Sequence, residues 1–149
     1  MKFVITGLPR TRSAWFSAYL SQGPVYCHHE ATFHGSSMDV PFDYVGNSDS
    51  GYILCPEWAE AQGPHKVVVI HRPVDEVEKS LASIGQKDTR WLLEQMEPSL
   101  QALDALHVDF HDINKRIKDI HDYLGIPGYH PYRAALYSKM NIQSQYWRN

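Results

Sequence analysis

Short apolar runs alternate along the chain with segments in which apolar residues recur every three or four positions. The runs predict buried strands, and the helical spacing between them predicts helices that pack against a sheet. Strand-helix-strand units are joined by right-handed connections, so the pattern indicates a parallel sheet with helices on both faces. We therefore expect an α/β fold, a single three-layer domain, with strands near residues 3–6, 25–28, 66–71 and 107–111.

The helices are predicted from apolar spacing and from glycine or proline at their ends. The first one carries Trp15, Phe16 and Tyr19 on one side, which favours core positions over a platform for stacking a base. Pro98 predicts a break of residues 88–106 into two helices, because proline lacks the N–H that a helix interior needs. The apolar positions of that stretch are Trp91, Leu92, Met96, Leu100, Leu103 and Leu106. Further helices are expected at 56–62, after Pro73 and at 113–124, and a short extended piece is expected near Phe42, Tyr44 and Val45.

The composition is that of one compact domain spanning residues 1–149, with 43% apolar and 12% aromatic residues. The formal net charge of −3 argues against a protein that coats nucleic acid. Cys27 and Cys55 form no C-x-x-C pair and the first apolar run is too short for a signal peptide, so we expect a reduced, cytoplasmic protein. No stretch approaches the roughly 20 apolar residues of a membrane span, and we expect no membrane association.

The strongest chemical signal lies in residues 7–15, where an apolar strand leads into a Gly-Leu-Pro turn and then a helix. Backbone N–H groups at a helix N-terminus lack intrahelical acceptors, and the helix dipole favours negative charge there. Arg10 and Arg12 add two permanent cations, and Thr11 and Ser13 add two hydroxyls. Because arginine binds planar oxyanions with two parallel hydrogen bonds, this segment predicts a loop that holds phosphate or sulfate.

The same segment fails the nucleotide-binding pattern G-x-x-x-x-G-K-S/T counted from Gly7. Arg12 stands in place of the second glycine, Ser13 in place of the lysine and Ala14 in place of the hydroxyl that holds magnesium. An ATP or GTP hydrolase is therefore disfavoured, and we expect no bound metal.

Two other groups of polar residues follow predicted strands. Arg72 comes directly after the strand at 66–71, and Ser80 lies two turns into the next helix. His29 and Glu30 follow the strand at 25–28. Ligands of open α/β sheets bind at the carboxyl ends of the strands, so these side chains are candidates for the same crevice as the loop.

Residues 7–15, GLPRTRSAW, resemble the 5′-phosphosulfate-binding loop of the sulfotransferase family, which runs roughly Pro-Lys/Arg-Ser/Thr-Gly-Thr/Ser-Thr-Trp/Leu. Arg72 and Ser80 have the spacing that binds the 3′-phosphate of the donor in that family. Residues 44–50 are similar to the segment between these two sites, and residues 107–127 look like the closing strand and helix. The chain departs from the family at Arg12, at Pro73, which comes one residue early, and in an abbreviated C-terminal region that has no Arg-Lys-Gly segment.

The resemblance implies a P-loop-like fold and transfer of a sulfuryl group from 3′-phosphoadenosine-5′-phosphosulfate to a hydroxyl or amine of a small-molecule or carbohydrate acceptor, leaving adenosine 3′,5′-bisphosphate. In that case Arg10 would stabilise the leaving phosphate and Glu30, or else His29, would deprotonate the acceptor. The residues expected to bind the donor are Gly7, Pro9, Arg10, Thr11, Arg12, Ser13, Ala14, Trp15, Arg72 and Ser80.

Other interpretations stay open at this stage. Arg10 and Arg12 could cap helix carboxyl ends or pair with surface acids, and Arg72 could pair with Asp75 or Glu76. Glu30 could simply lie in a solvated loop. The cluster at 27–30 could bind a metal, although adjacent residues of an extended chain point in different directions. The chain could also be a non-catalytic nucleotide-binding or anion-binding module of the same fold, or a small-molecule kinase.

Overall fold

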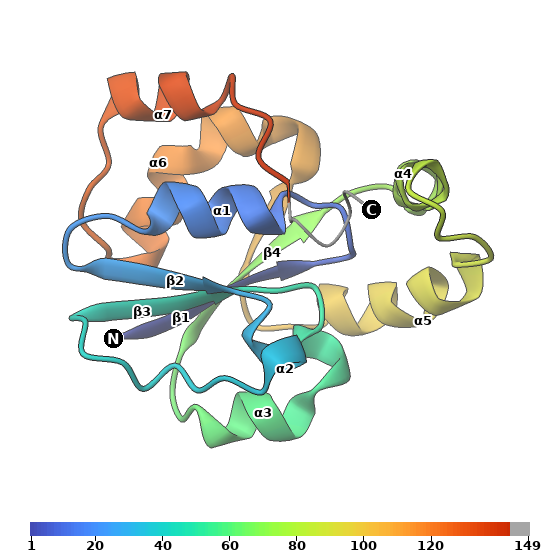
Figure 1. Ribbon diagram of the computed structural model, residues 1–149, viewed down its shortest axis with the longest axis horizontal. Helices are drawn as coiled ribbons and strands as arrows, with labels where there is room; N and C mark the ends of the chain where they lie inside the picture. The colour runs from blue at the N-terminus through green and yellow to red at the C-terminus, as the bar shows by residue number, and fades with distance from the viewer. Residues whose placement is uncertain (144–149) are drawn as a thin grey trace.

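The computed structural model describes residues 1–143, so residues 144–149, which the predicted domain includes, lie outside the described part (Figure 1). Its centre is a five-stranded sheet in which every pair of neighbouring strands is parallel. The strand order is β2-β3-β1-β4-β5. The strands are β1 (Lys2–Gly7), β2 (Val25–His29), β3 (Tyr44–Ser48), β4 (Lys66–His71) and β5 (Leu106–Asp109).

The predicted α/β class with a parallel sheet and flanking helices is confirmed. β4 lies between β1 and β5, and its apolar residues are buried on both faces of the sheet. Val68 and Ile70 join one core, whereas Val67 and Val69 join the other. A strand covered on both sides reads as an uninterrupted apolar run, which explains why its sequence was easy to interpret.

One face of the sheet is covered by α1 (Ser13–Leu20), α6 (Ile113–Leu124) and α7 (Pro131–Tyr137), drawn above the sheet in Figure 1. Trp15, Phe16 and Tyr19 of α1 are at most 2% exposed and belong to this core, as their spacing predicts. We did not predict α7. Its signals are local ones, a proline at the first helical position after His130, whose Nδ1 accepts a hydrogen bond from the N–H of Tyr132.

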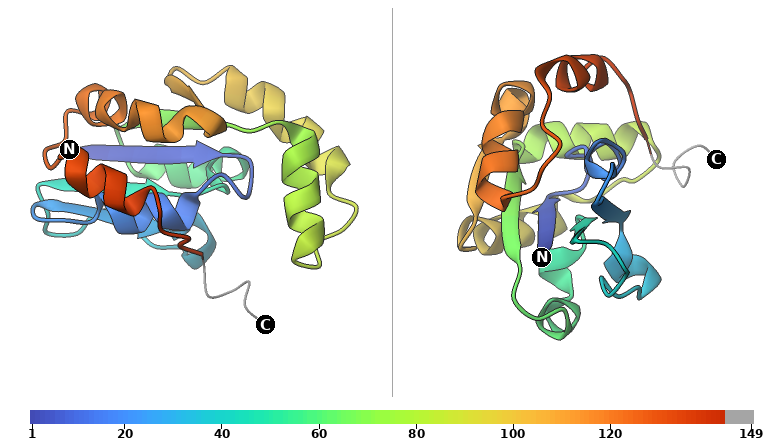
Figure 2. Two further views of the ribbon diagram at one scale, coloured as in Figure 1. Left: turned by 90° about the horizontal axis from the view of Figure 1, so that it is seen from above. Right: turned by 90° about the vertical axis from the view of Figure 1, so that its left-hand side faces the viewer.

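The other face is covered by the 3₁₀ turn η1 (Tyr52–Leu54) and the helices α3 (Pro56–Ala61), α4 (Val74–Ser83) and α5 (Arg90–Gln101). The short helix α2 (Ala31–His34) precedes β3 and lies on the same side. In the left view of Figure 2, α4 stands beyond the tip of the β1 arrow, across the carboxyl ends of the strands. α4 therefore borders the edge of the sheet where ligands bind in this class of fold.

Four details of the prediction differ from the structure. Pro98 does not break its helix, because it lies on the exposed side of α5 while Leu93, Met96 and Leu100 hold both halves against the sheet. Trp91 and Leu92 are 71% and 42% exposed and do not face the core. The last strand ends at Asp109 and continues as a 3₁₀ turn, η2 (Phe110–Asp112), rather than as a strand. The sheet also contains β3, which we expected only as a short extended piece.

Among residues 1–143, no helix combines the length and the apolar character needed to cross a membrane.

Gly7 ends β1 and lies opposite Ile70 of β4. A Cβ atom at this position would lie 2.4 Å from the carbonyl oxygen of Ile70 and 3.0 Å from Oγ1 of Thr11. The oxygen belongs to a central strand and cannot move aside alone. We therefore expect Gly7→Ala to lower the free energy of unfolding by about 1–3 kcal/mol, the usual cost of overpacking a core. Urea denaturation measures the change, and an unaltered midpoint and slope would contradict this account of Gly7.

Candidate functional site

A cavity of about 230 Å³ lies at the carboxyl edge of the sheet. Each of the five strands contributes to its lining through the residues that follow the strand. These are Arg10 after β1, Glu30 after β2, Ser50 after β3, Arg72 after β4 and Phe110 after β5. Residues 141–143 complete one wall. The cavity, called the anion cavity below, therefore occupies the crevice in which open α/β sheets bind their ligands.

The loop between β1 and α1 bends tightly around this cavity. The Oγ1 hydroxyl of buried Thr11 donates a hydrogen bond to the carbonyl oxygen of Leu8 at 2.8 Å, which closes the turn. Arg10 and Arg12 both have left-handed backbone conformations, with φ of 66° and 68°. Glycine adopts this conformation with little cost, whereas other residues lose about 1–2 kcal/mol. Arg12 thus has a backbone conformation that favours glycine, while its side chain adds a cation.

The loop leads directly into the N-terminus of α1. The first intrahelical hydrogen bond runs from the N–H of Phe16 to the carbonyl oxygen of Arg12 at 2.9 Å. The preceding N–H groups, on Ser13, Ala14 and Trp15, have no intrahelical acceptor, and no side chain caps this helix. Ser13 and Ala14 line the anion cavity, so the positive end of the helix dipole faces it.

Arg10 and Arg72 connect the two predicted anion motifs. Nε of Arg10 donates to Oγ of Ser80 at 2.9 Å, and Nη1 of Arg72 donates to the carbonyl oxygen of Arg10 at 2.7 Å. The guanidinium of Arg72 also lies over the ring of Phe110, 4.2 Å from its centroid. Burial and then the positive charge of Arg72 lower the pKa of Arg10. Two cations are therefore held close together, an arrangement that an anion between them would stabilise.

Arg12 also lines the anion cavity. Its Nη1 donates to Oδ1 of Asn114 at 2.9 Å, and its guanidinium lies 5.4 Å from the ring centroid of Trp15 and 5.7 Å from that of Phe110. Burial lowers the pKa of Arg12. Within residues 1–143, no carboxylate is within ion-pair distance of Arg10 or Arg12, so the alternative in which these two side chains pair with surface acids finds no partner there.

The ion-pair alternative holds in part for Arg72. Its Nε lies 3.4 Å from Oε1 of Glu76, which is a long contact. The same carboxylate accepts from Nε2 of His111 at 2.8 Å and 2.9 Å, and the hydrogen bond from His111 is the main reason that the pKa of Glu76 is lowered. Asp75 pairs with Arg90 instead. Glu76 therefore shares its charge between two partners and leaves that of Arg72 only partly neutralised.

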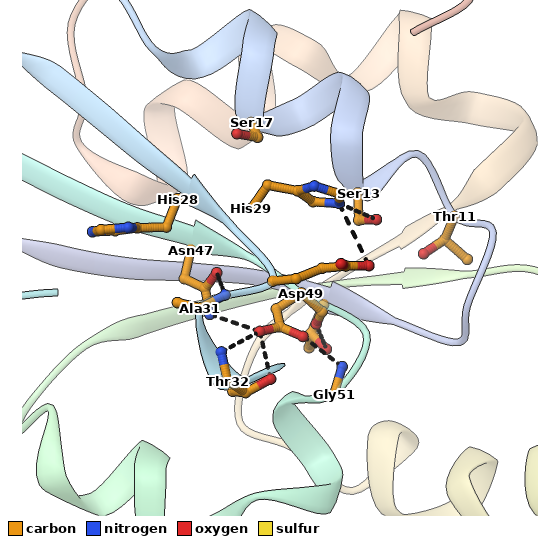
Figure 3. A network of polar contacts seen from close by, with 12 residues as sticks. Thr11, Ser13, Ser17, His28, His29, Ala31, Thr32, Asn47, Asp49 and Gly51 are labelled. Atoms are coloured by element: carbon orange, nitrogen blue, oxygen red, sulfur yellow. Dashed lines mark hydrogen bonds and ion pairs between the residues drawn. The ribbon is translucent and has the colours of Figure 1, made fainter. Parts of the chain in front are cut away.

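His29 ends β2 and Glu30 follows it, and the two place an imidazole and a carboxylate beside the loop. Figure 3 shows the ring of His29 next to Ser13. Nε2 of His29 lies 3.2 Å from Oγ of Ser13 and 3.7 Å from Oε1 of Glu30. Burial is the main cause that lowers the pKa of His29, against the opposing charges of Glu30 and Asp49, so its ring is neutral near pH 7. Glu30 lines the anion cavity and has a left-handed backbone with φ of 57°. Strain of this kind in a residue other than glycine gathers at functional sites.

Asp49, which the sequence analysis did not assign, holds the segments after β2 and β3 together through Thr32, Asn47 and Gly51 (Figure 3). Its side chain is buried, and it accepts hydrogen bonds from the N–H of Thr32 at 2.8 Å, Oγ1 of Thr32 at 2.6 Å, the N–H of Gly51 at 2.7 Å and Nδ2 of Asn47 at 3.1 Å. A carboxylate with this many donors is a structural anchor and has little capacity left for a ligand. A carboxylate directly after a strand was the signal that could have indicated it.

The structure brings most of the predicted site residues together. Those that line the anion cavity are Pro9, Arg10, Arg12, Ser13, Ala14, Glu30, Arg72 and Ser80. Gly7, Thr11 and Trp15 lie behind it, where Gly7 allows the approach of β4, Thr11 closes the turn, and Nε1 of buried Trp15 donates to the carbonyl oxygen of Tyr137 at 2.8 Å. His29 contacts the lining through Ser13 and Glu30.

Residues 27–30 are the segment considered above as an alternative metal site. In the part of the chain that the structure describes, no three His, Cys, Asp or Glu side chains are grouped to hold a metal ion. The thiol of Cys27 is buried, which raises its pKa and opposes the thiolate that a metal would need.

Comparison of the chain with models of known protein families gave no match, and no curated protein sequence matched it either.

Proposed function

We propose that this protein is a sulfotransferase-like enzyme of P-loop-like fold, which transfers a sulfuryl group from 3′-phosphoadenosine-5′-phosphosulfate to an acceptor hydroxyl or amine. The observation that carries the proposal is the convergence of Arg10, Arg12 and Arg72 on one cavity at the uncapped N-terminus of α1. A donor with two anionic groups suits a site with this much positive charge.

Two groups of residues in the lining of the anion cavity would bind the two ends of the donor. Ser13 and the free N–H groups at the start of α1 would hold the 5′-phosphate end. Arg72 and Ser80 would hold the 3′-phosphate, as the family spacing implies. Arg10 belongs to the loop and bonds to Ser80, so its charge lies between the two groups.

The proposed reaction needs one base and one stabilised leaving group. The acceptor oxygen or nitrogen forms the new bond to sulfur and gives its proton to the carboxylate of Glu30. The bond between sulfur and the bridging oxygen breaks, and its electron pair stays on the 5′-phosphate of adenosine 3′,5′-bisphosphate. Arginine stays protonated in proteins, so Arg10 would act on that phosphate by charge alone.

Binding of adenosine 3′,5′-bisphosphate to Arg72→Ala tests the donor site. We expect a loss of about 1.5–3 kcal/mol, or roughly 10- to 150-fold in Kd, because a charge-assisted hydrogen bond is removed. Calorimetry measures this change in Kd.

Arg90→Ala is the matched control, since Arg90 pairs with Asp75, Glu78 and Glu94 outside the anion cavity. This variant should leave the Kd unchanged. Equal Kd values for Arg72→Ala and the unmodified chain would make Arg72 a structural residue. Binding without any turnover would favour the non-catalytic module.

Turnover should not require a metal ion. Ala14 stands where nucleotide-hydrolysing loops place the hydroxyl that binds magnesium, and a sulfuryl group carries less charge than a phosphoryl group. We therefore expect the same rate with EDTA and with added Mg²⁺ in a sulfate-transfer assay. A rate that vanishes with EDTA and returns with Mg²⁺ would instead favour a small-molecule kinase.

A further inference from the structure

A second cavity, of about 370 Å³, adjoins the anion cavity. The two cavities share Glu30 and Ser50 in their linings, so Glu30 stands at their junction. The second cavity is formed by the loop and helix after β2 and by the turn after β3. Its lining consists of Glu30, Thr32, Phe33, Asp49, Ser50, Gly51, Leu54 and Cys55. It is called the apolar cavity below.

The walls of this cavity offer apolar surface and few available hydrogen-bonding groups. Phe33 and Leu54 are 77% and 55% exposed, which is unusual for side chains of this size that lie beside the same hollow. Glu30 and Ser50 offer polar groups only at the junction with the anion cavity. Away from this junction, Asp49 and Thr32 already bond to each other, and Asp49 also accepts from the N–H of Gly51. A sugar would have to bury hydroxyls without partners here, whereas an apolar ligand would cover exposed hydrophobic surface.

We propose that the apolar cavity binds the acceptor, and that the acceptor is a small apolar molecule with one hydroxyl, such as a phenol, rather than a carbohydrate. This inference rests on the proposed function for the chemistry at the hydroxyl. The apolar body of the acceptor lies against Phe33 and Leu54, and its hydroxyl points to Glu30. The hydroxyl proton passes to Glu30, the oxygen bonds to sulfur, and the electron pair of the broken S–O bond stays on the 5′-phosphate of the donor. The volume falls within the range of ordinary small-molecule sites.

Cys55 gives a direct readout of this cavity, because it lies in the lining and is partly exposed. Cys27, the other cysteine of the chain, is buried, and burial raises its pKa, so alkylation at Cys55 can be followed separately by mass spectrometry. With 1-naphthol as the probe, we expect slower alkylation of Cys55 by iodoacetamide. Methyl β-glucoside at the same concentration should not slow it.

Two variants test whether the protection of Cys55 arises from binding in the apolar cavity. Leu54→Ser should raise the concentration of 1-naphthol needed for protection by roughly tenfold, because apolar contact area is lost. Trp91→Ser is the matched control, since Trp91 is 71% exposed on α5 and lies outside the lining of both cavities, and it should leave protection unchanged. The inference is overturned if 1-naphthol gives no protection to the unmodified chain, or if methyl β-glucoside protects equally well.

Binding of adenosine 3′,5′-bisphosphate separates this inference from the proposed function. Protection of Cys55 by 1-naphthol in a chain that does not bind the bisphosphate would contradict the sulfotransferase proposal and leave only an apolar ligand site. Bisphosphate binding without protection would contradict the acceptor class alone. Formation of naphthyl sulfate from 1-naphthol and 3′-phosphoadenosine-5′-phosphosulfate, reduced in Leu54→Ser and unchanged in Trp91→Ser, would support both.

Discussion

Glu30→Gln is expected to lower turnover by roughly 10²- to 10⁴-fold, the usual share of a general base. Glutamine keeps the shape of the side chain at the junction of the two cavities but cannot accept a proton. The affinity for adenosine 3′,5′-bisphosphate should stay the same, because the cations proposed to hold it lie on the loop after β1 and directly after β4. Steady-state rates with saturating donor, together with calorimetry, measure the two effects separately.

The backbone of Glu30 provides a second test. Since φ is 57° at Glu30, Glu30→Gly should raise the free energy of unfolding by about 1 kcal/mol while turnover falls as far as in Glu30→Gln. Asp88 has the same φ of 57° in the loop before α5 and lies outside the anion cavity, so Asp88→Gly is the matched control. It should stabilise the fold by a similar amount and leave turnover unchanged. Full activity in Glu30→Gly would show that Glu30 is not the general base.

His29 is the competing base. Its neutral ring can accept a proton near pH 7, but its Nε2 faces both Ser13 and Glu30, and His29 does not line the anion cavity. We therefore expect His29→Ala to lower turnover less than Glu30→Gln does. If His29→Ala is inactive while Glu30→Gln keeps its full rate, the base is His29.

The sequence predicted the elements whose pattern is dominated by burial. β1 and β4 are apolar on both sides, and the aromatic side of α1 lies in the core. β3 was harder to recognise because Asn47 and Ser48 are buried polar residues within it. Asn47 is needed there for hydrogen bonds to the N–H of Ala31 and to Asp49, which only the assembled loops reveal. Buried polar residues that make tertiary contacts interrupt the apolar pattern by which a strand is recognised in a sequence.

The candidate site was predictable where one segment carries the whole signal and not where segments meet. The loop at residues 7–15 and the spacing from Arg72 to Ser80 could be recognised locally. The contact of Arg10 with Ser80 joins residues 70 positions apart, and the apolar cavity combines the segments after β2 and β3, so neither follows from spacing. Arg12 shows a third case, because its left-handed backbone conformation is one that favours glycine and could not be expected from an arginine in the sequence.

Arg10→Met is expected to lower turnover by roughly 10²- to 10³-fold, the usual effect of removing one group that stabilises charge in a transition state. Methionine fills similar space without charge, so the loss measures electrostatics more than packing. Because Arg10 also bonds to Ser80 and approaches Arg72, we expect weaker binding of adenosine 3′,5′-bisphosphate as well. Arg10→Lys should recover part of both, since lysine restores the charge but not the planar donor pair.

Ser80→Ala separates the two roles of Arg10. The variant removes the acceptor of the Arg10 Nε hydrogen bond but keeps the guanidinium and its charge. If Arg10 acts on the leaving phosphate, Ser80→Ala should weaken binding of the bisphosphate and leave turnover at saturating donor within a few-fold of the unmodified chain, whereas Arg10→Met lowers both. The opposite outcome is an equal loss of affinity in both variants with no loss of turnover in either. Arg10 would then belong to the 3′-phosphate site, and Arg12 and the N-terminus of α1 would stabilise the charge of the leaving group.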